Sequence, residues 1–269
     1  MRAVSPRSTE KGSGTVGRQQ DPVGVFDSGI GGISALIAMK RLLPGETFIY
    51  YGDARNAPYG TKSTDEVIRI VRHVVRILTD QHIKALVIAC NTATGAAAAT
   101  LRRELEIPVI GMEPALKPAS EIRNNGDILV LATPLTLQQE KFDRLMEKYG
   151  EGAVRVPCVG LMELVENEDL KGSEVYLKNL FSQYDMERVD AVVLGCTHYV
   201  FLKDMIRDMI PSRTAITEGS EGTARQLKQI LQRNNLISDA KEGKIILETS
   251  GTDSDLALMR RFLAKYGTD

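Results

Sequence analysis

Short apolar runs rich in β-branched residues alternate with helical patterns along most of the chain. This alternation constrains the fold more than any other feature of the sequence. Several runs are apolar at every position, as expected for parallel strands that helices cover on both faces. The alternation therefore predicts an α/β protein with mostly parallel sheets. The expected strands are 23–26, 47–51, 85–89, 109–111, 128–132, 154–156, 191–194, 214–216 and 244–248.

The clearest helix signal covers residues 64–78. Ser63 and Glu66 stand three residues apart at its start, in the spacing of a capping box. Apolar residues then recur at helical spacing, which predicts one buried face. This stripe consists of Val67, Ile70, Val71, Val74, Ile77 and Leu78.

A weak internal repeat divides the chain into two similar parts. Cys90 and Cys196 stand 106 residues apart, and each ends an expected strand. The same offset moves residues 23–27 onto 129–133 and residues 48–51 onto 154–157, which are again strand candidates. We therefore expect two pseudo-symmetric α/β halves. Ligands of open α/β sheets bind beyond the carboxyl ends of the strands, so the active site is expected in the cleft between the halves.

The expected domain boundaries follow from this repeat and from proline-containing links near 113–118 and 211–213. The first domain is expected to combine residues 22–115 with 212–269, and the second to comprise residues 116–211. Residues 1–21 are rich in Ser, Gly and Arg and carry no apolar stretch. They are expected to form a disordered leader.

Composition excludes several classes of protein. The chain holds 34 Lys and Arg against 35 Asp and Glu, so no overall positive field favours a nucleic acid. No apolar run reaches the roughly 18 residues that span a membrane. The three cysteines include no Cys-x-x-Cys pair, which argues against a structural zinc site and a disulfide scaffold. We expect a reduced, cytoplasmic protein in which Cys158 is structural.

Two glycine-containing segments follow expected strands. Residues 26–32, FDSGIGG, could form a tight turn or bring backbone N–H groups close to an anion. They fail the dinucleotide fingerprint, because Ser34 stands where its third glycine is needed. Asp27, at the tip of a strand, is less easily explained by packing. The segment Pro58-Tyr59-Gly60 could be a turn, or its hydroxyl and amide could hold a carboxylate.

The two cysteine motifs carry the strongest chemical signal. A single cysteine at the end of a strand is more often a small buried side chain than a catalyst. Here, however, Asn91 and Thr92 follow Cys90, and Thr197 and His198 follow Cys196. These neighbours can donate to a bound anion. A helix N-terminus or a protonated histidine would also lower the pKa of a thiol from its reference value of about 8.5.

Together these motifs resemble the cofactor-independent aspartate/glutamate racemase family, and within it the glutamate racemases. The resemblance covers about residues 23–269, and the two cysteine motifs combined with the DSG and PYG segments are specific. The matching stretches are FDSGIGG (26–32), PYGTKS (58–63), ALVIACNTAT (85–94), PVIGMEPA (108–115), LATP (131–134), LVE (164–166), VLGCTHY (193–199) and TA (223–224).

The resemblance implies a role for each matching residue. Cys90 would take the α-proton of D-glutamate and Cys196 that of L-glutamate, and each thiol would donate in the reverse direction. Asp27 would assist Cys90, whereas Glu166 and His198 would assist Cys196. The positions implied to bind substrate are Asp27, Ser28, Tyr59, Gly60, Asn91, Thr92, Thr197 and His198.

The resemblance also implies a wider setting. It implies a cytoplasmic enzyme that supplies D-glutamate for peptidoglycan, uses no cofactor and no metal, and binds a small-molecule substrate as a homodimer.

The sequence departs from the family pattern at several positions. Gln139 and Phe142 stand where Ser and Tyr are common, and Glu163 replaces the usual Pro, which blurs the alignment of Glu166. Three other functions stay open: a racemase of another acid such as aspartate, a hydrolase that uses Cys196 and His198 alone, and a catalytically silent amino-acid sensor.

Overall fold

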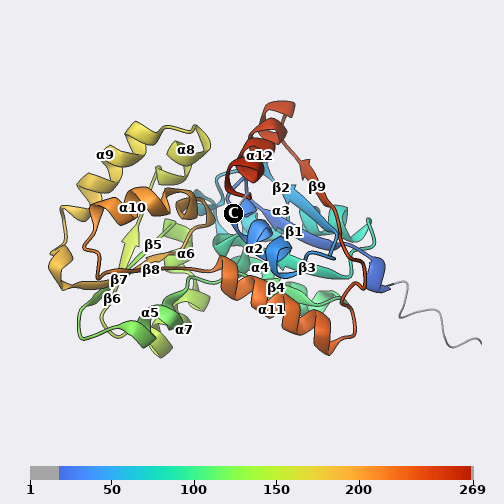
Figure 1. The fold of residues 1–269 in the computed structure, drawn as a ribbon, viewed down its shortest axis with the longest axis horizontal. Coiled ribbons are helices and arrows are strands. Elements are labelled where there is room, and N and C mark those ends of the chain that lie inside the picture. The colour runs from blue at the N-terminus through green and yellow to red at the C-terminus, as the bar shows by residue number, and fades with distance from the viewer. Residues whose placement is uncertain (1–17, 268–269) are drawn as a thin grey trace, which may run out of the picture.

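Two sheets of parallel strands organise the protein in the computed structural model, which describes residues 18–267 (Figure 1). The first sheet has the order β4-β3-β1-β2-β9 and the second the order β6-β5-β7-β8. The strands are β1 (Val23–Asp27), β2 (Phe48–Gly52), β3 (Ala85–Ile88), β4 (Val109–Gly111), β5 (Asp127–Ala132), β6 (Ala153–Pro157), β7 (Val189–Leu194), β8 (Ala215–Glu218) and β9 (Ile245–Thr249).

The internal repeat is visible in the topology. The offset that separates Cys90 from Cys196 moves β1, β2, β3 and β4 onto β5, β6, β7 and β8, to within two residues at each strand end. Both sets of four strands are also arranged in the same order, and β9 extends only the first sheet. The predicted fold class, two similar α/β halves with parallel sheets, is therefore confirmed.

Helices cover both faces of each sheet. The predicted capping interaction is present at the start of α3, where Glu66 N donates to Ser63 Oγ over 3.3 Å. The helices of the first half are α2 (Ile33–Leu42), α3 (Thr64–Thr79), α4 (Asn91–Glu104), α11 (Ser220–Arg233) and α12 (Asp253–Tyr266). Those of the second half are α5 (Leu116–Ile122), α6 (Pro134–Gln138), α7 (Glu140–Tyr149), α8 (Leu161–Glu166), α9 (Leu170–Phe181) and α10 (Lys203–Met209).

One apolar core continues from the first half into the second. It joins Val25 of β1 and Leu36 of α2 to Leu131 of β5 and Leu161 of α8, all of them buried. The outer faces of the two sheets have their own smaller cores, under α3 and α4 in one half and under α5 and α7 in the other. Because burying apolar surface drives folding, the shared core holds the facing ends of the two sheets together. No helix within residues 18–267 combines the length and apolar character needed to cross a bilayer.

Two boundaries differ from the sequence expectations. Strand β8 pairs with β7, so residues 215–218 belong to the second sheet and do not accompany the rest of 212–269. At the other end, residues 18–20 form a helical turn, and Lys84 Nζ donates to Gln19 O over 2.5 Å. The segment 18–21 is thus packed against the first half, whereas residues 1–17 of the expected leader lie outside the described residues. The division into two domains stays a prediction.

Candidate active site

The motif residues converge where the central strands of the two sheets end. Asp27 ends β1 and Thr133 follows β5, whereas Cys90 and Cys196 follow β3 and β7. Side chains from both halves line one small pocket there. Its lining residues are Ser28, Tyr59, Gly60, Cys90, Asn91, Thr92, Thr133, Met162, Cys196, Thr197 and His198. Both thiols therefore border one space, as the repeat predicted.

Cys90 caps the N-terminus of α4. Its Sγ accepts from Ala93 N over 3.4 Å and lies 3.9 Å from Ser28 Oγ. Burial and the nearby Asp27 carboxylate raise the pKa of the Cys90 thiol, although the Ala93 N–H and the Ser28 hydroxyl oppose that shift. The free protein therefore holds Cys90 as a thiol that can donate a proton.

Cys196 is the first member of a chain of three polar side chains. Its Sγ lies 3.7 Å from His198 Nδ1, and His198 Nε2 lies 2.9 Å from Glu166 Oε1. Burial alone would lower the pKa of His198, but the hydrogen bonds with Cys196 and Glu166 outweigh it and raise the pKa well above the ordinary value. The raised pKa favours a protonated His198 imidazole beside the Cys196 sulfur.

Asp27 connects the first half to the second. Its Oδ2 accepts from Gly32 N over 2.7 Å and from Thr197 Oγ1 over 3.3 Å. The adjoining glycine turn approaches closely, because a Cβ on Gly31 would overlap Thr197 Oγ1 and lie against the His198 ring. Gly31 thus allows the close contact between the two halves at this turn.

Three threonine hydroxyls make a second connection. Thr92 Oγ1 lies 3.0 Å from Thr133 Oγ1 and 2.9 Å from Thr136 Oγ1. Thr133 lines the cavity although no sequence motif indicated it as a site residue. It stands one repeat offset after Asp27, so the repeat itself could have identified it. Met162, which also lines the cavity, gave no signal in the sequence.

Tyr59 forms a hydrogen bond with Asp53, a residue that does not line the cavity and that the sequence motifs did not indicate. Its hydroxyl donates to Asp53 Oδ2 over 2.5 Å, and Asn56 Nδ2 donates to both oxygens of the same carboxylate. Burial and the adjacent Asp53 raise the pKa of Tyr59, so the phenol stays neutral. Because its proton points to Asp53, the Tyr59 oxygen can act toward the cavity only as an acceptor.

The predicted residues thus fall into two groups. Nine line the cavity, whereas Asp27 and Glu166 each contact a lining residue through a hydrogen bond. Cys158 is buried but does not line the cavity. Burial and, to a smaller extent, the nearby Cys196 raise the pKa of the Cys158 thiol to about 12. Within residues 18–267, no three His, Cys, Asp or Glu side chains gather as a set of metal ligands.

Comparison with known proteins tests the family resemblance. The family model described as Asp/Glu/Hydantoin racemase matches residues 32–225, which is most of the chain. The chain belongs to this family. The resemblance stated from the cysteine, DSG and PYG motifs is therefore confirmed, and the site described above is that of an Asp/Glu/Hydantoin racemase family member.

Similar proteins match nearly the whole length of the chain. The glutamate racemase of Clostridium acetobutylicum is 48% identical over 252 residues, covering 91% of this chain and 98% of that protein. The structure of glutamate racemase isoform RacE1 from Bacillus anthracis is 32% identical, with a TM-score of 0.82, and covers 91% of this chain and 95% of that one. Escherichia coli glutamate racemase, in complex with L-glutamate and the activator UDP-MurNAc-ala, is 29% identical with a TM-score of 0.80 and the same coverages.

Proposed function

We propose that the protein is a glutamate racemase that moves the α-proton of glutamate between Cys90 and Cys196. The observation that carries this proposal is that both thiols border one cavity, each from the end of the corresponding strand in the two halves. Inversion at carbon needs a base on one face and an acid on the other, whereas hydrolysis needs a single nucleophile. The paired thiols therefore favour racemisation over a hydrolase.

In the direction from L-glutamate, the Cys196 thiolate removes the α-proton and becomes a thiol. The electron pair of the broken C–H bond stays on the α-carbon and is delocalised into the adjoining carboxylate. The Cys90 thiol then donates its proton to the opposite face, so that D-glutamate forms and Cys90 is left as a thiolate. Conversion of D-glutamate runs through the same steps in reverse.

The charge states of the free site support this sequence of steps. The raised pKa of Cys90 keeps a proton ready for donation, and the raised pKa of His198 keeps an imidazolium beside Cys196. Glu166 accepts from the far side of that imidazolium and holds its orientation. We assign Asp27 to Cys90, whose titration its carboxylate influences.

Recognition of an amino acid fits the polar groups of the site. Asp27 Oδ1 and Asn91 Oδ1 are buried acceptors for which the described residues supply no hydrogen-bond donor. An α-ammonium group carries three donors and could satisfy such acceptors. We further assign substrate contacts to Ser28, Tyr59, Gly60, Asn91, Thr92, Thr197 and His198. Glutamate is chosen as the substrate because the relatives that match most of the chain are glutamate racemases.

The resemblance carries the wider proposals. We infer that the enzyme acts as a cytoplasmic homodimer without a cofactor, and that its D-glutamate supplies peptidoglycan synthesis.

The test is to incubate either enantiomer with the enzyme in deuterated water. We expect both enantiomers to racemise and to gain α-deuterium, and we expect Cys90→Ser and Cys196→Ser to stop racemisation. Failure of both enantiomers to racemise would refute the proposal. Turnover of aspartate instead would indicate a different acid substrate. Hydrolytic turnover that survives Cys90→Ser would indicate a single-thiol enzyme, and thermal stabilisation by glutamate without turnover would indicate a sensor.

A further inference from the structure

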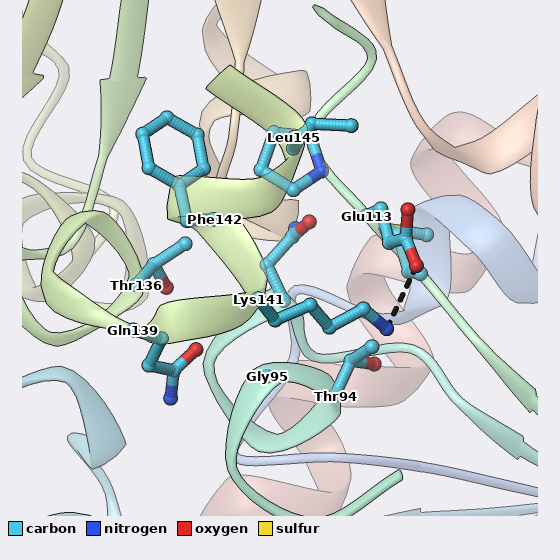
Figure 2. Close-up of a pocket in the computed structure, with 11 residues that line it drawn as sticks. Thr94, Gly95, Glu113, Thr136, Gln139, Lys141, Phe142 and Leu145 are labelled. Carbon is cyan, nitrogen blue, oxygen red and sulfur yellow. Dashed lines mark ion pairs between the residues drawn. The ribbon is translucent and has the colours of Figure 1, made fainter. Parts of the chain in front are cut away.

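A glutamine of the second half reaches the helix that begins at Cys90. Gln139 lies between α6 and α7, and its Nε2 donates to the backbone oxygen of Thr92 in α4 over 3.0 Å. Its side chain is buried. Figure 2 shows Gln139 pointing from the α6–α7 junction toward the turn of α4 that holds Gly95.

The helix is adapted to this contact. A Cβ on Gly95 would overlap Oε1 of Gln139, so the glutamine packs where α4 lacks a side chain. Glycine in a helix interior costs about 1 kcal/mol relative to alanine. A helix-weakening residue thus stands at the point where the amide of Gln139 sits, so the two positions are sterically coupled.

The turn that Gln139 contacts is the turn that carries the chemistry. Cys90 caps α4, and Asn91 and Thr92 form its first turn beside the reaction cavity. We propose that Gln139 is a positioning residue whose hydrogen bond to Thr92 fixes this turn, and with it the Cys90 thiol, against the half that carries Cys196. This inference rests on the proposed two-thiol function.

An ion pair also connects the second half to the first near Gln139, and it does not depend on the Gln139 side chain. Lys141 Nζ of α7 pairs with Glu113 Oε1, in the segment after β4, over 2.7 Å (Figure 2). This ion pair does not involve α4, so a change at Gln139 leaves it in place. Thr92 Oγ1 also keeps its contacts with Thr133 and Thr136, so loss of the Gln139 hydrogen bond should loosen the Cys90 turn without unfolding the protein.

A displaced Cys90 has an asymmetric consequence. From L-glutamate, Cys196 still removes the α-proton, but a misplaced Cys90 delivers its proton poorly. The Cys196 thiol then exchanges with solvent and returns a deuteron to the same face, so deuterium enters without inversion. From D-glutamate, Cys90 is itself the base, so exchange and racemisation fall together. A loss of folded protein would lower all of these rates equally.

The experiment compares Gln139→Leu with Gln138→Leu in deuterated water. Gln138 is the adjacent, exposed glutamine and is the matched control. Gln139→Leu should lower kcat/KM about tenfold, as expected for a lost buried hydrogen bond. It should also raise the ratio of exchange to racemisation from L-glutamate, a ratio that a fall of a few degrees in melting temperature would not change. Gln139→Glu, which keeps the length but loses the donor when ionised, should behave likewise.

A double-mutant cycle tests the pairing with Gly95 independently. Gly95→Ala should impair racemisation in the wild-type background, because the new methyl group displaces the Gln139 amide. In a Gln139→Ala background it should have no further effect on the rate. Equal rates and exchange ratios for Gln139→Leu and Gln138→Leu would overturn the inference. A wild-type protein that does not racemise glutamate would instead overturn the proposed function.

Discussion

The contact between His198 and Glu166 yields the most specific kinetic prediction. Glu166→Gln keeps the size of the side chain and removes its charge, so the imidazolium of His198 loses its anionic partner. Two unit charges about 4 Å apart attract by ~1 kcal/mol in water and ~4 kcal/mol at an effective dielectric constant of 20. The Glu166 side chain is 25% exposed, so its environment lies between these limits. An intermediate value of about 2 kcal/mol corresponds to a loss of about 30-fold in kcat/KM.

The direction of the pH effect follows from the same contact. His198 has a raised pKa because its hydrogen bonds with Cys196 and Glu166 outweigh burial. Removing the charge of Glu166 lowers that pKa, so the imidazolium deprotonates at lower pH. The alkaline limb of the kcat/KM profile should therefore move to lower pH in Glu166→Gln.

The assay is racemisation of each enantiomer followed by circular dichroism across the pH range. Both directions should lose the same factor, because the two enantiomers have equal free energies. Glu163→Gln, one turn earlier on α8, is the matched control and should leave the rate and the profile unchanged. An unaltered alkaline limb in Glu166→Gln, or an equal effect of Glu163→Gln, would refute the reasoning.

Three further predictions follow from single contacts. Asp53→Asn should raise KM about tenfold, since it removes the charged acceptor that orients the Tyr59 hydroxyl. In a Tyr59→Phe background the same change should not raise KM further, and additive increases in KM would contradict this role of Asp53. Lys84→Met should destabilise the protein by about 3–5 kcal/mol and lower Tm by roughly 10 °C, because it leaves the buried Glu46 carboxylate unpaired. In a thermal melt, the double variant Lys84→Met/Glu46→Leu should recover most of this loss, and a double variant as unstable as the single one would count against this explanation. Cys158→Ala should keep kcat/KM within about twofold of wild type, because Cys158 is absent from the cavity lining. A fall in kcat/KM comparable to that of Cys196→Ser would contradict a purely structural role for Cys158.

The strands could be predicted from the sequence because local patterns determine them. Each of the nine expected strands overlaps an observed one, and the expected residues 109–111 match β4 in both bounds. The expected grouping of residues 212–269 with the first domain did not anticipate that β8 pairs with β7, because apolar alternation does not say which sheet a strand joins. The repeat contained that information, since its offset places residues 109–111 of β4 on residues 215–217 of β8.

The site was predictable only where the repeat or a motif marked it. The two thiols and their polar neighbours follow strands, and parallel topology gathers strand ends at one edge of a sheet. Asp53 and Gln139 could not be found in this way. Their roles depend on the three-dimensional approach of a carboxylate to Tyr59 and of an amide to Thr92, which have no counterpart in local sequence patterns.

In the proposed mechanism the two thiols act on opposite faces of one carbon. The most direct measurement is the hydrogen isotope in D-glutamate formed at early conversion of L-glutamate in deuterated water, read by mass spectrometry together with the remaining substrate. Two separate thiols predict product that is almost fully deuterated at the α-carbon and substrate that still carries protium. Product that retains the original protium would show that a single base moves the proton across the carbon, and would contradict the account.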